Sequence, residues 1–68
     1  MFITVHDRTH SSDAIILRVD RINRVMPLDR WYSRIYVETN EADFPVKVID
    51  CYEDVDEICT LLEEAQES

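Results

Sequence analysis

Residues 31–39, Trp-Tyr-Ser-Arg-Ile-Tyr-Val-Glu-Thr, carry the clearest structural pattern in the chain. In an extended strand, successive side chains point to opposite faces. One face would hold Ser33, Ile35, Val37 and Thr39, and the other Tyr32, Arg34, Tyr36 and Glu38. We therefore expect a strand here, followed by a two-residue turn at Asn40–Glu41, because Asn readily adopts the left-handed conformation. Residues 42–49 predict the returning strand, in which Pro45 indicates a sheet edge or a bulge.

Three further strands are expected before this hairpin. Residues 2–6 and 22–26 are short apolar segments, and residues 14–19 form a β-branched run that predicts a strand buried on both faces. The polar segment 7–13 predicts a loop, and residues 20–21 interrupt the pattern as a bulge, a turn or a short helical break. The chain has no glycine, so its turns must use Asn, Asp, Ser and Pro.

Residues 54–66 predict one amphipathic helix. At about 100° per residue, a single arc gathers the apolar positions Val55, Ile58, Cys59, Leu61, Leu62 and Ala65. The opposite arc carries the carboxylates of Asp56, Glu57, Glu63, Glu64 and Glu67. Asp54, with Glu57 three residues later, resembles a capping box that starts the helix. We expect Cys59 to be a buried structural thiol at the margin of the apolar face.

These elements predict an α+β fold in one small domain, residues 1–68: an antiparallel sheet of four or five strands with the C-terminal helix on one face. The second face of the sheet would then be short of cover. Tyr32, Tyr36, Ile16 and Ile49, with arginines between them, are expected to line it. A chain of this size gains core by association, so we expect a homodimer or a small ring.

The charge is strongly acidic and unevenly distributed. The chain holds 15 acidic and 7 basic residues, a net charge of −8. Residues 1–34 carry six arginines and a net charge of +2, whereas residues 35–68 carry −10. An acidic surface repels phosphate backbones, so nucleic-acid binding is not expected, although the arginines between residues 18 and 34 leave room for a local basic patch.

The sequence also lacks signals for a membrane or for export. No apolar run is long enough to span a bilayer, and the first ten residues lack the basic-then-apolar layout of a signal peptide. Two cysteines are too few for a disulfide framework. We therefore expect a cytoplasmic protein with no membrane partner.

No group of residues has the spacing of a metal or cofactor site. His6 and His10 are four apart, but they fall on a strand end and in a loop. Cys51 and Cys59 are too far apart for a zinc or redox motif, and a bridge between them is the less favoured alternative. The run of carboxylates from Asp50 to Glu57 lacks the glycine and the alternation of a calcium loop.

Catalysis is not expected either. The absence of glycine excludes glycine-rich phosphate loops. Ser11 and Ser12, beside His10, have no orienting third residue and no oxyanion donor. The sequence therefore predicts a protein that is not an enzyme and has no metal or cofactor.

The segment from Val19 to Leu62 resembles the FlbD-like family of small flagellar and swarming-motility proteins. The resemblance lies in Ile22, Val25 and Pro27, then two strands joined by a tight turn, Val46-Lys47-Val48, and a capped amphipathic helix. Asn40-Glu41 stands where the family has Asn-Gly, Asp54 replaces a Ser cap, and residues 30–32 are an insertion. The resemblance implies a small non-enzymatic regulator that acts through protein contacts, with no catalytic residues to transfer.

The sequence therefore leaves two main hypotheses for the function and a third, less favoured one. The first is a protein-interaction module that uses a sheet face or edge, with its surface formed by Arg30, Trp31, Tyr32, Arg34 and Tyr36. The alternative is an acidic inhibitor or nucleic-acid mimic of the phage or mobile-element type. Its acidic contact face would be Asp56, Glu57, Glu63 and Glu64, docked in a basic groove of a host protein. The third is direct nucleic-acid binding through residues 18–34, with the aromatic residues as a stacking platform.

Overall fold

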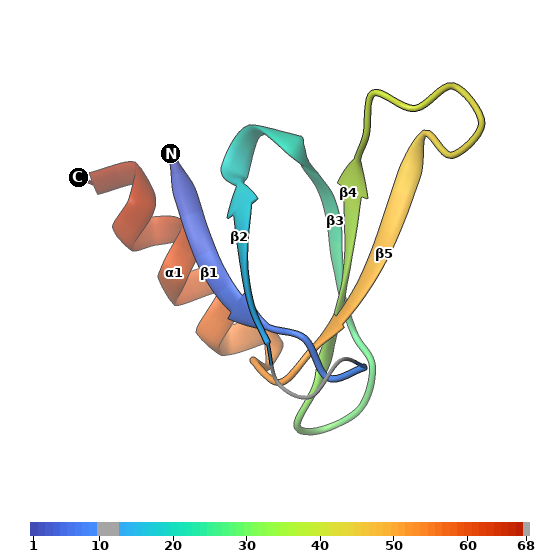
Figure 1. Ribbon diagram of the computed structural model, residues 1–68. Helices are drawn as coiled ribbons and strands as arrows, with labels where there is room; N and C mark the ends of the chain where they lie inside the picture. The colour runs from blue at the N-terminus through green and yellow to red at the C-terminus, as the bar shows by residue number, and fades with distance from the viewer. Residues whose placement is uncertain (10–12, 68) are drawn as a thin grey trace.

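The computed structural model describes residues 1–9 and 13–67, which form two small antiparallel sheets and one helix (Figure 1). The elements are, in chain order, β1 (Phe2–His6), β2 (Ala14–Arg18), the 3₁₀ turn η1 (Val19–Arg21), β3 (Ile22–Pro27), β4 (Ser33–Glu38), β5 (Val46–Cys51) and α1 (Val55–Glu67). The expected α+β class is confirmed. In the described part of the chain, no helix is long and apolar enough to cross a membrane.

The expected single sheet is not found, because the strands divide into two sheets. β1 pairs with β2, and the second sheet has the order β3-β4-β5. The interruption expected at residues 20–21 is a short helical break, the 3₁₀ turn η1, which separates β2 from β3. The sheets meet at one corner, where Asp7 forms an isolated bridge with Cys51 and the Tyr52 N–H donates to the His6 carbonyl at 3.0 Å.

The division into two sheets also corrects the prediction that β2 is buried on both faces. Leu17 is 6% exposed, whereas Ile16, on the opposite face of the same strand, is 69% exposed. Only the face of the β1–β2 pair that points toward the other sheet is covered. The apolar run therefore behaves as an ordinary half-buried strand.

The predicted tight turn at Asn40–Glu41 is wrong, and β5 begins at Val46 rather than at residue 42. The chain makes a wider connection, closed by a hydrogen bond from the Thr39 N–H to the Pro45 carbonyl at 2.9 Å. The Asn40 side-chain oxygen accepts a hydrogen bond from Arg21 at 2.9 Å, which holds the connection against η1. Pro45 has no N–H with which to extend a ladder, so pairing starts after it.

The core lies between the two sheets and α1. Its members are all at most 6% exposed: Ile3, Val5, Leu17, Ile35, Ile49, Cys51 and Ile58. They come from the inward-facing positions of the strands and from one helix face, as the alternation of β4 predicts. Ile49 lies opposite Ile35 in the β4–β5 register. Its expected place on the uncovered face is therefore wrong.

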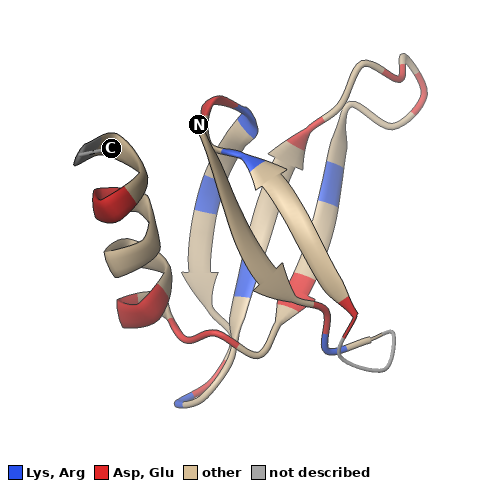
Figure 2. Cartoon of the chain, turned by 60° about the vertical axis from the view of Figure 1, so that its left-hand side comes forward, with Lys and Arg blue, Asp and Glu red and all other residues tan. Residues whose placement is uncertain are grey.

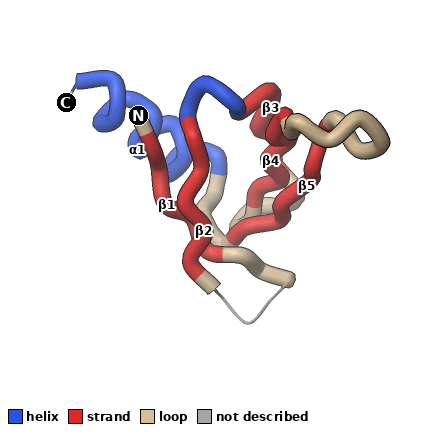
Figure 3. The backbone as a smooth tube through the Cα atoms, turned by 45° about the horizontal axis from the view of Figure 1, so that its top comes forward, coloured by secondary structure: helices blue, strands red, loops and turns tan. Residues whose placement is uncertain are grey.

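The helix begins where the sequence indicates. The Glu57 N–H donates to Asp54 Oδ1 at 2.8 Å, so Asp54 is the N-cap and the helix starts at Val55. Ile58 is fully buried, and α1 contacts β1 and β3. Figure 3 shows α1 beside β1. Cys59, however, is exposed, which corrects the expected buried thiol. It lies about 100° around the helix from Ile58, and the contact stripe is too narrow to cover it.

Candidate interaction surface

The outer face of the β3–β4–β5 sheet is not covered by α1 and carries a mixed aromatic and charged surface. Strand register places its residues in two rows across the sheet. One row runs Arg24, Tyr36 and Val48, and the other runs Met26, Arg34 and Asp50. We call these six residues, with Tyr32 and Tyr52, the outer face. Because they alternate with the buried positions Ser33, Ile35, Ile49 and Cys51, folding of the core presents them outward.

An ion pair fixes the centre of the outer face. Arg34 Nε donates to Asp50 Oδ1 at 2.8 Å, and a second guanidinium nitrogen donates to Oδ2 at 3.3 Å. This two-point geometry is the strongest form of an arginine–carboxylate pair. The hydrogen bonds from Arg34 lower the pKa of the Asp50 carboxyl, and those same bonds raise the pKa of Arg34.

An aromatic cluster lies beside this ion pair at the corner between the sheets. The guanidinium of Arg8 stacks over the Tyr32 ring, 4.0 Å from its centroid. Tyr32 in turn meets Tyr52 edge to face, with centroids 5.7 Å apart. Arg8 and Tyr52 were not predicted, because they come from opposite ends of the sequence. The corner brings them together, where the Arg8 N–H donates to the Asp50 carbonyl at 2.8 Å.

Only some residues of the predicted interaction surface lie on the same face in the structure. Tyr32, Arg34 and Tyr36 share the outer face, as the alternation predicts. Arg30 and Trp31 instead lie in the connection between β3 and β4, so Trp31 does not start the strand. Asp29 Oδ1 accepts the N–H groups of both Trp31 and Tyr32, at 2.7 and 3.0 Å, and so forms this turn. Trp31 is 66% exposed at its tip.

Apolar side chains remain accessible on the outer face and at its margin. Val48 is 48% exposed and Tyr52 is 43% exposed. Val46, the next outward position of β5, is 41% exposed, and Phe44, in the connection before it, is 69% exposed. This row along one strand differs from a single scattered apolar residue, which would need no explanation.

The predicted acidic contact face is exposed along α1. Asp56, Glu57, Glu63 and Glu64 all lie at the surface, and Figure 2 shows the acidic colouring of the helix. In the described residues, no basic side chain forms an ion pair with any of these four carboxylates. Glu57 and Glu64 also line an open groove between α1 and β1, which the other two do not.

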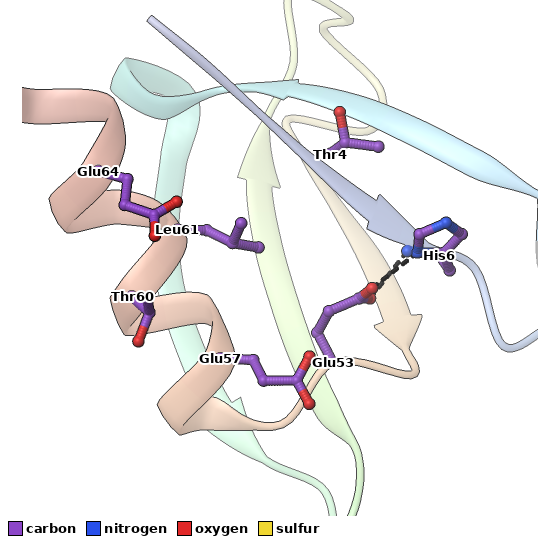
Figure 4. A pocket seen from close by; sticks show the side chains of 7 residues that line it. All are labelled: Thr4, His6, Glu53, Glu57, Thr60, Leu61 and Glu64. Carbon is purple, nitrogen blue, oxygen red and sulfur yellow. Dashed lines mark hydrogen bonds and ion pairs between the residues drawn. The ribbon is translucent and has the colours of Figure 1, made fainter. Parts of the chain in front are cut away.

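That groove has a volume of about 370 Å³ and is lined by Thr4, His6, Glu53, Glu57, Thr60, Leu61 and Glu64 (Figure 4). His6 closes one end of it, because its Nδ1 lies 2.7 Å from Glu53 Oε2 and its main-chain N–H donates to Glu53 Oε1 at 2.8 Å. Across residues 1–9 and 13–67, no group of three or more His, Cys, Asp or Glu side chains could hold a metal ion. His10, Ser11 and Ser12 lie outside the described residues.

The two cysteines are free and differ in environment. Cys51 is fully buried, with its Sγ 3.6 Å from the carbonyl oxygens of Ser33 and Glu53. Burial raises the pKa of the Cys51 thiol to about 11, so it stays protonated at neutral pH. Cys59 lies on the exposed side of α1. The two thiols do not form a disulfide in this structure.

No family model, no curated protein and no solved structure matches the chain.

Proposed function

We propose that this chain is a small cytoplasmic, non-enzymatic interaction module that self-associates through the outer face, as a homodimer. A small ring would need a second, different contact surface on each copy. The observation that carries the proposal is the uncovered outer face, on which Tyr36 and Val48 lie side by side in the β4–β5 register. The helix packs on the opposite side of this sheet. The apolar side chains of the outer face therefore remain for a partner to cover.

The charges on the outer face and at its margin favour a second copy as the partner. Arg24 and Glu38 are both exposed and occupy outward positions on neighbouring strands. In a two-fold contact the same patch meets itself, so an arginine on one copy can face a glutamate on the other. Arg34 and Asp50 already satisfy each other within the chain, so they enter the contact as a neutral pair.

The small size of the chain adds support. A domain of about 60 residues buries only about 60% of the surface that its unfolded chain exposes, so association supplies missing core. The resemblance to the FlbD-like family, with its implied regulator that acts through protein contacts, points to the same class of function.

Light scattering on a sizing column tests the proposal with two matched variants. Val48→Glu places a charge on the outer face, and Ile16→Glu places one on the outer face of the β1–β2 pair, where Ile16 is 69% exposed. We expect the wild type and Ile16→Glu to have a mass of at least twice the 8.1 kDa of one chain at both low and high salt. Val48→Glu should elute as a folded monomer. A monomeric wild type, or equal behaviour of the two variants, would overturn the proposal.

The acidic inhibitor or nucleic-acid mimic remains the alternative function. It is favoured by the exposed carboxylates of Asp56, Glu57, Glu63 and Glu64, none of which has an ion-pair partner among the described residues. Such a protein would occupy a basic groove of a host protein, and its affinity would fall steeply with ionic strength. Association through the outer face depends mainly on apolar contact and would change little with salt.

A further inference from the structure

The hydrogen bonds of β1 show which of its main-chain groups point away from β2. The Val19 N–H donates to the Met1 carbonyl at 3.1 Å, and the Asp7 N–H donates to the Asp13 carbonyl at 2.9 Å. In an antiparallel pair, alternate residues exchange hydrogen bonds with the partner strand. Odd-numbered residues of β1 therefore bond to β2. The N–H and C=O groups of Phe2, Thr4 and His6 point to the opposite edge.

That edge is occupied at His6 and open at Thr4. The His6 N–H donates to Glu53 Oε1 at 2.8 Å, and the His6 carbonyl accepts the Tyr52 N–H at 3.0 Å. Within residues 1–9 and 13–67, β1 pairs with no strand other than β2, and its bridge to β5 lies beyond its end, at Asp7. The main chain of Thr4 is therefore available for one more strand.

Space for such a strand exists beside Thr4. The groove of about 370 Å³ has β1 as one wall and the Glu57–Glu64 face of α1 as the other. Figure 4 shows Thr4 and His6 on the strand side and Thr60, Leu61 and Glu64 on the helix side, with the His6–Glu53 contact at one end. An extended segment between a strand edge and a helix gains its affinity from main-chain hydrogen bonds and its specificity from alternate side chains.

The chemistry of the walls selects a basic occupant. Glu57 and Glu64 are two helical turns apart and lie on either side of Leu61, and no Lys or Arg side chain lines the groove. The stem of a lysine or arginine can cover Leu61 while its charged end reaches a carboxylate. A second copy of this chain, with a net charge of −8, does not match these walls.

We propose that the groove between β1 and α1 binds an extended basic peptide segment, which adds to β1 as a strand at Thr4 and places Lys or Arg side chains against Glu57 and Glu64. This site goes beyond the proposed self-association and uses a different surface. The two proposals can therefore fail independently.

The test uses a capped hexapeptide of alternating threonine and lysine, titrated into isotope-labelled protein and followed by NMR. We expect shift changes at Thr4, Thr60 and Leu61 and slower hydrogen exchange of the Thr4 amide. A peptide with glutamate in place of lysine should not bind. The main-chain nitrogens of the peptide can be methylated either at its odd-numbered or at its even-numbered residues. One of these two methylated peptides should not bind, because it lacks the N–H groups that pair with β1.

Two matched helix variants separate the groove from general acidity. The double variant Glu57→Gln/Glu64→Gln should weaken binding about fivefold or more, an effect that added salt should mimic. Glu63→Gln, which removes an exposed charge from the same helix outside the groove, should stay within about twofold of the wild type. Three results would overturn the proposal: no binding, equal binding of the acidic peptide, or shift changes confined to the outer face. The Val48→Glu variant should bind the peptide as the wild type does.

Discussion

The two faces of the β3–β4–β5 sheet arise from the same strands and yet differ in almost every physical property. The inner face places Ile35 and Ile49 in contact with the other sheet and α1, at 0% and 6% exposure. The outer face presents Tyr36 and the Arg34–Asp50 pair, none of them fully buried. Successive residues therefore differ in role: the buried ones stabilise the fold, and the outward ones are available for the association that we propose. A substitution on one face should leave the property of the other face nearly intact.

The largest effect should come from the inner face. Ile35→Ala should lower the free energy of unfolding by about 2–5 kcal/mol, because it leaves a cavity in a fully buried position. Val48→Ala on the outer face should cost less than about 1 kcal/mol in dilute monomer, since Val48 is 48% exposed. Urea unfolding of both variants measures the difference. Similar losses of unfolding free energy in the two variants would mean that the two faces contribute equally to stability.

A second test compares the thiol of the inner face with the thiol on α1. Cys59 should react rapidly with an aromatic disulfide reagent at pH 8, and Cys51 should react only as fast as the protein opens. The cause is twofold: Cys51 is fully buried, and burial raises the pKa of its thiol to about 11. Cys59→Ser should remove the fast phase alone. Two equally fast thiols would contradict the buried position of Cys51.

The smallest effect should come from the ion pair on the outer face. Hydrogen bonds from Arg34 lower the pKa of Asp50, so the pair stabilises the folded state above the ordinary aspartate pKa of about 4. That contribution is lost as the pH falls through the lowered pKa of the folded state. Asp50→Asn should therefore be less stable than the wild type near neutral pH, and the difference should shrink toward zero in acid. A difference in urea midpoints that is independent of pH would argue against this role for Asp50.

Local patterns predicted the parts of the fold that depend on neighbouring residues. The alternation of residues 33–38 identified both faces of β4, and Asp54 with Glu57 located the start of α1 to within one residue. Periodicity also placed Ile58 in the core. These features follow from strand and helix geometry, which a short stretch of sequence contains.

Contacts between distant segments set the features that the sequence did not reveal. The corner that joins Asp7 to Cys51 splits the expected sheet in two and brings Arg8 to Tyr32. The bond between Arg21 and Asn40 holds the wider connection before β5. The groove beside Thr4 depends on where α1 docks. No local pattern encodes these partners, because each one pairs segments that lie far apart in the chain.

We propose above that the outer face holds one copy to another. An NMR dilution series maps this contact directly, because the amide shifts of interface residues change as the assembly dissociates. We expect changes at Arg24, Tyr36 and Val48 and constant shifts at Glu63 on the exposed side of α1. Changes confined to α1, or no change over the whole concentration range, would contradict it.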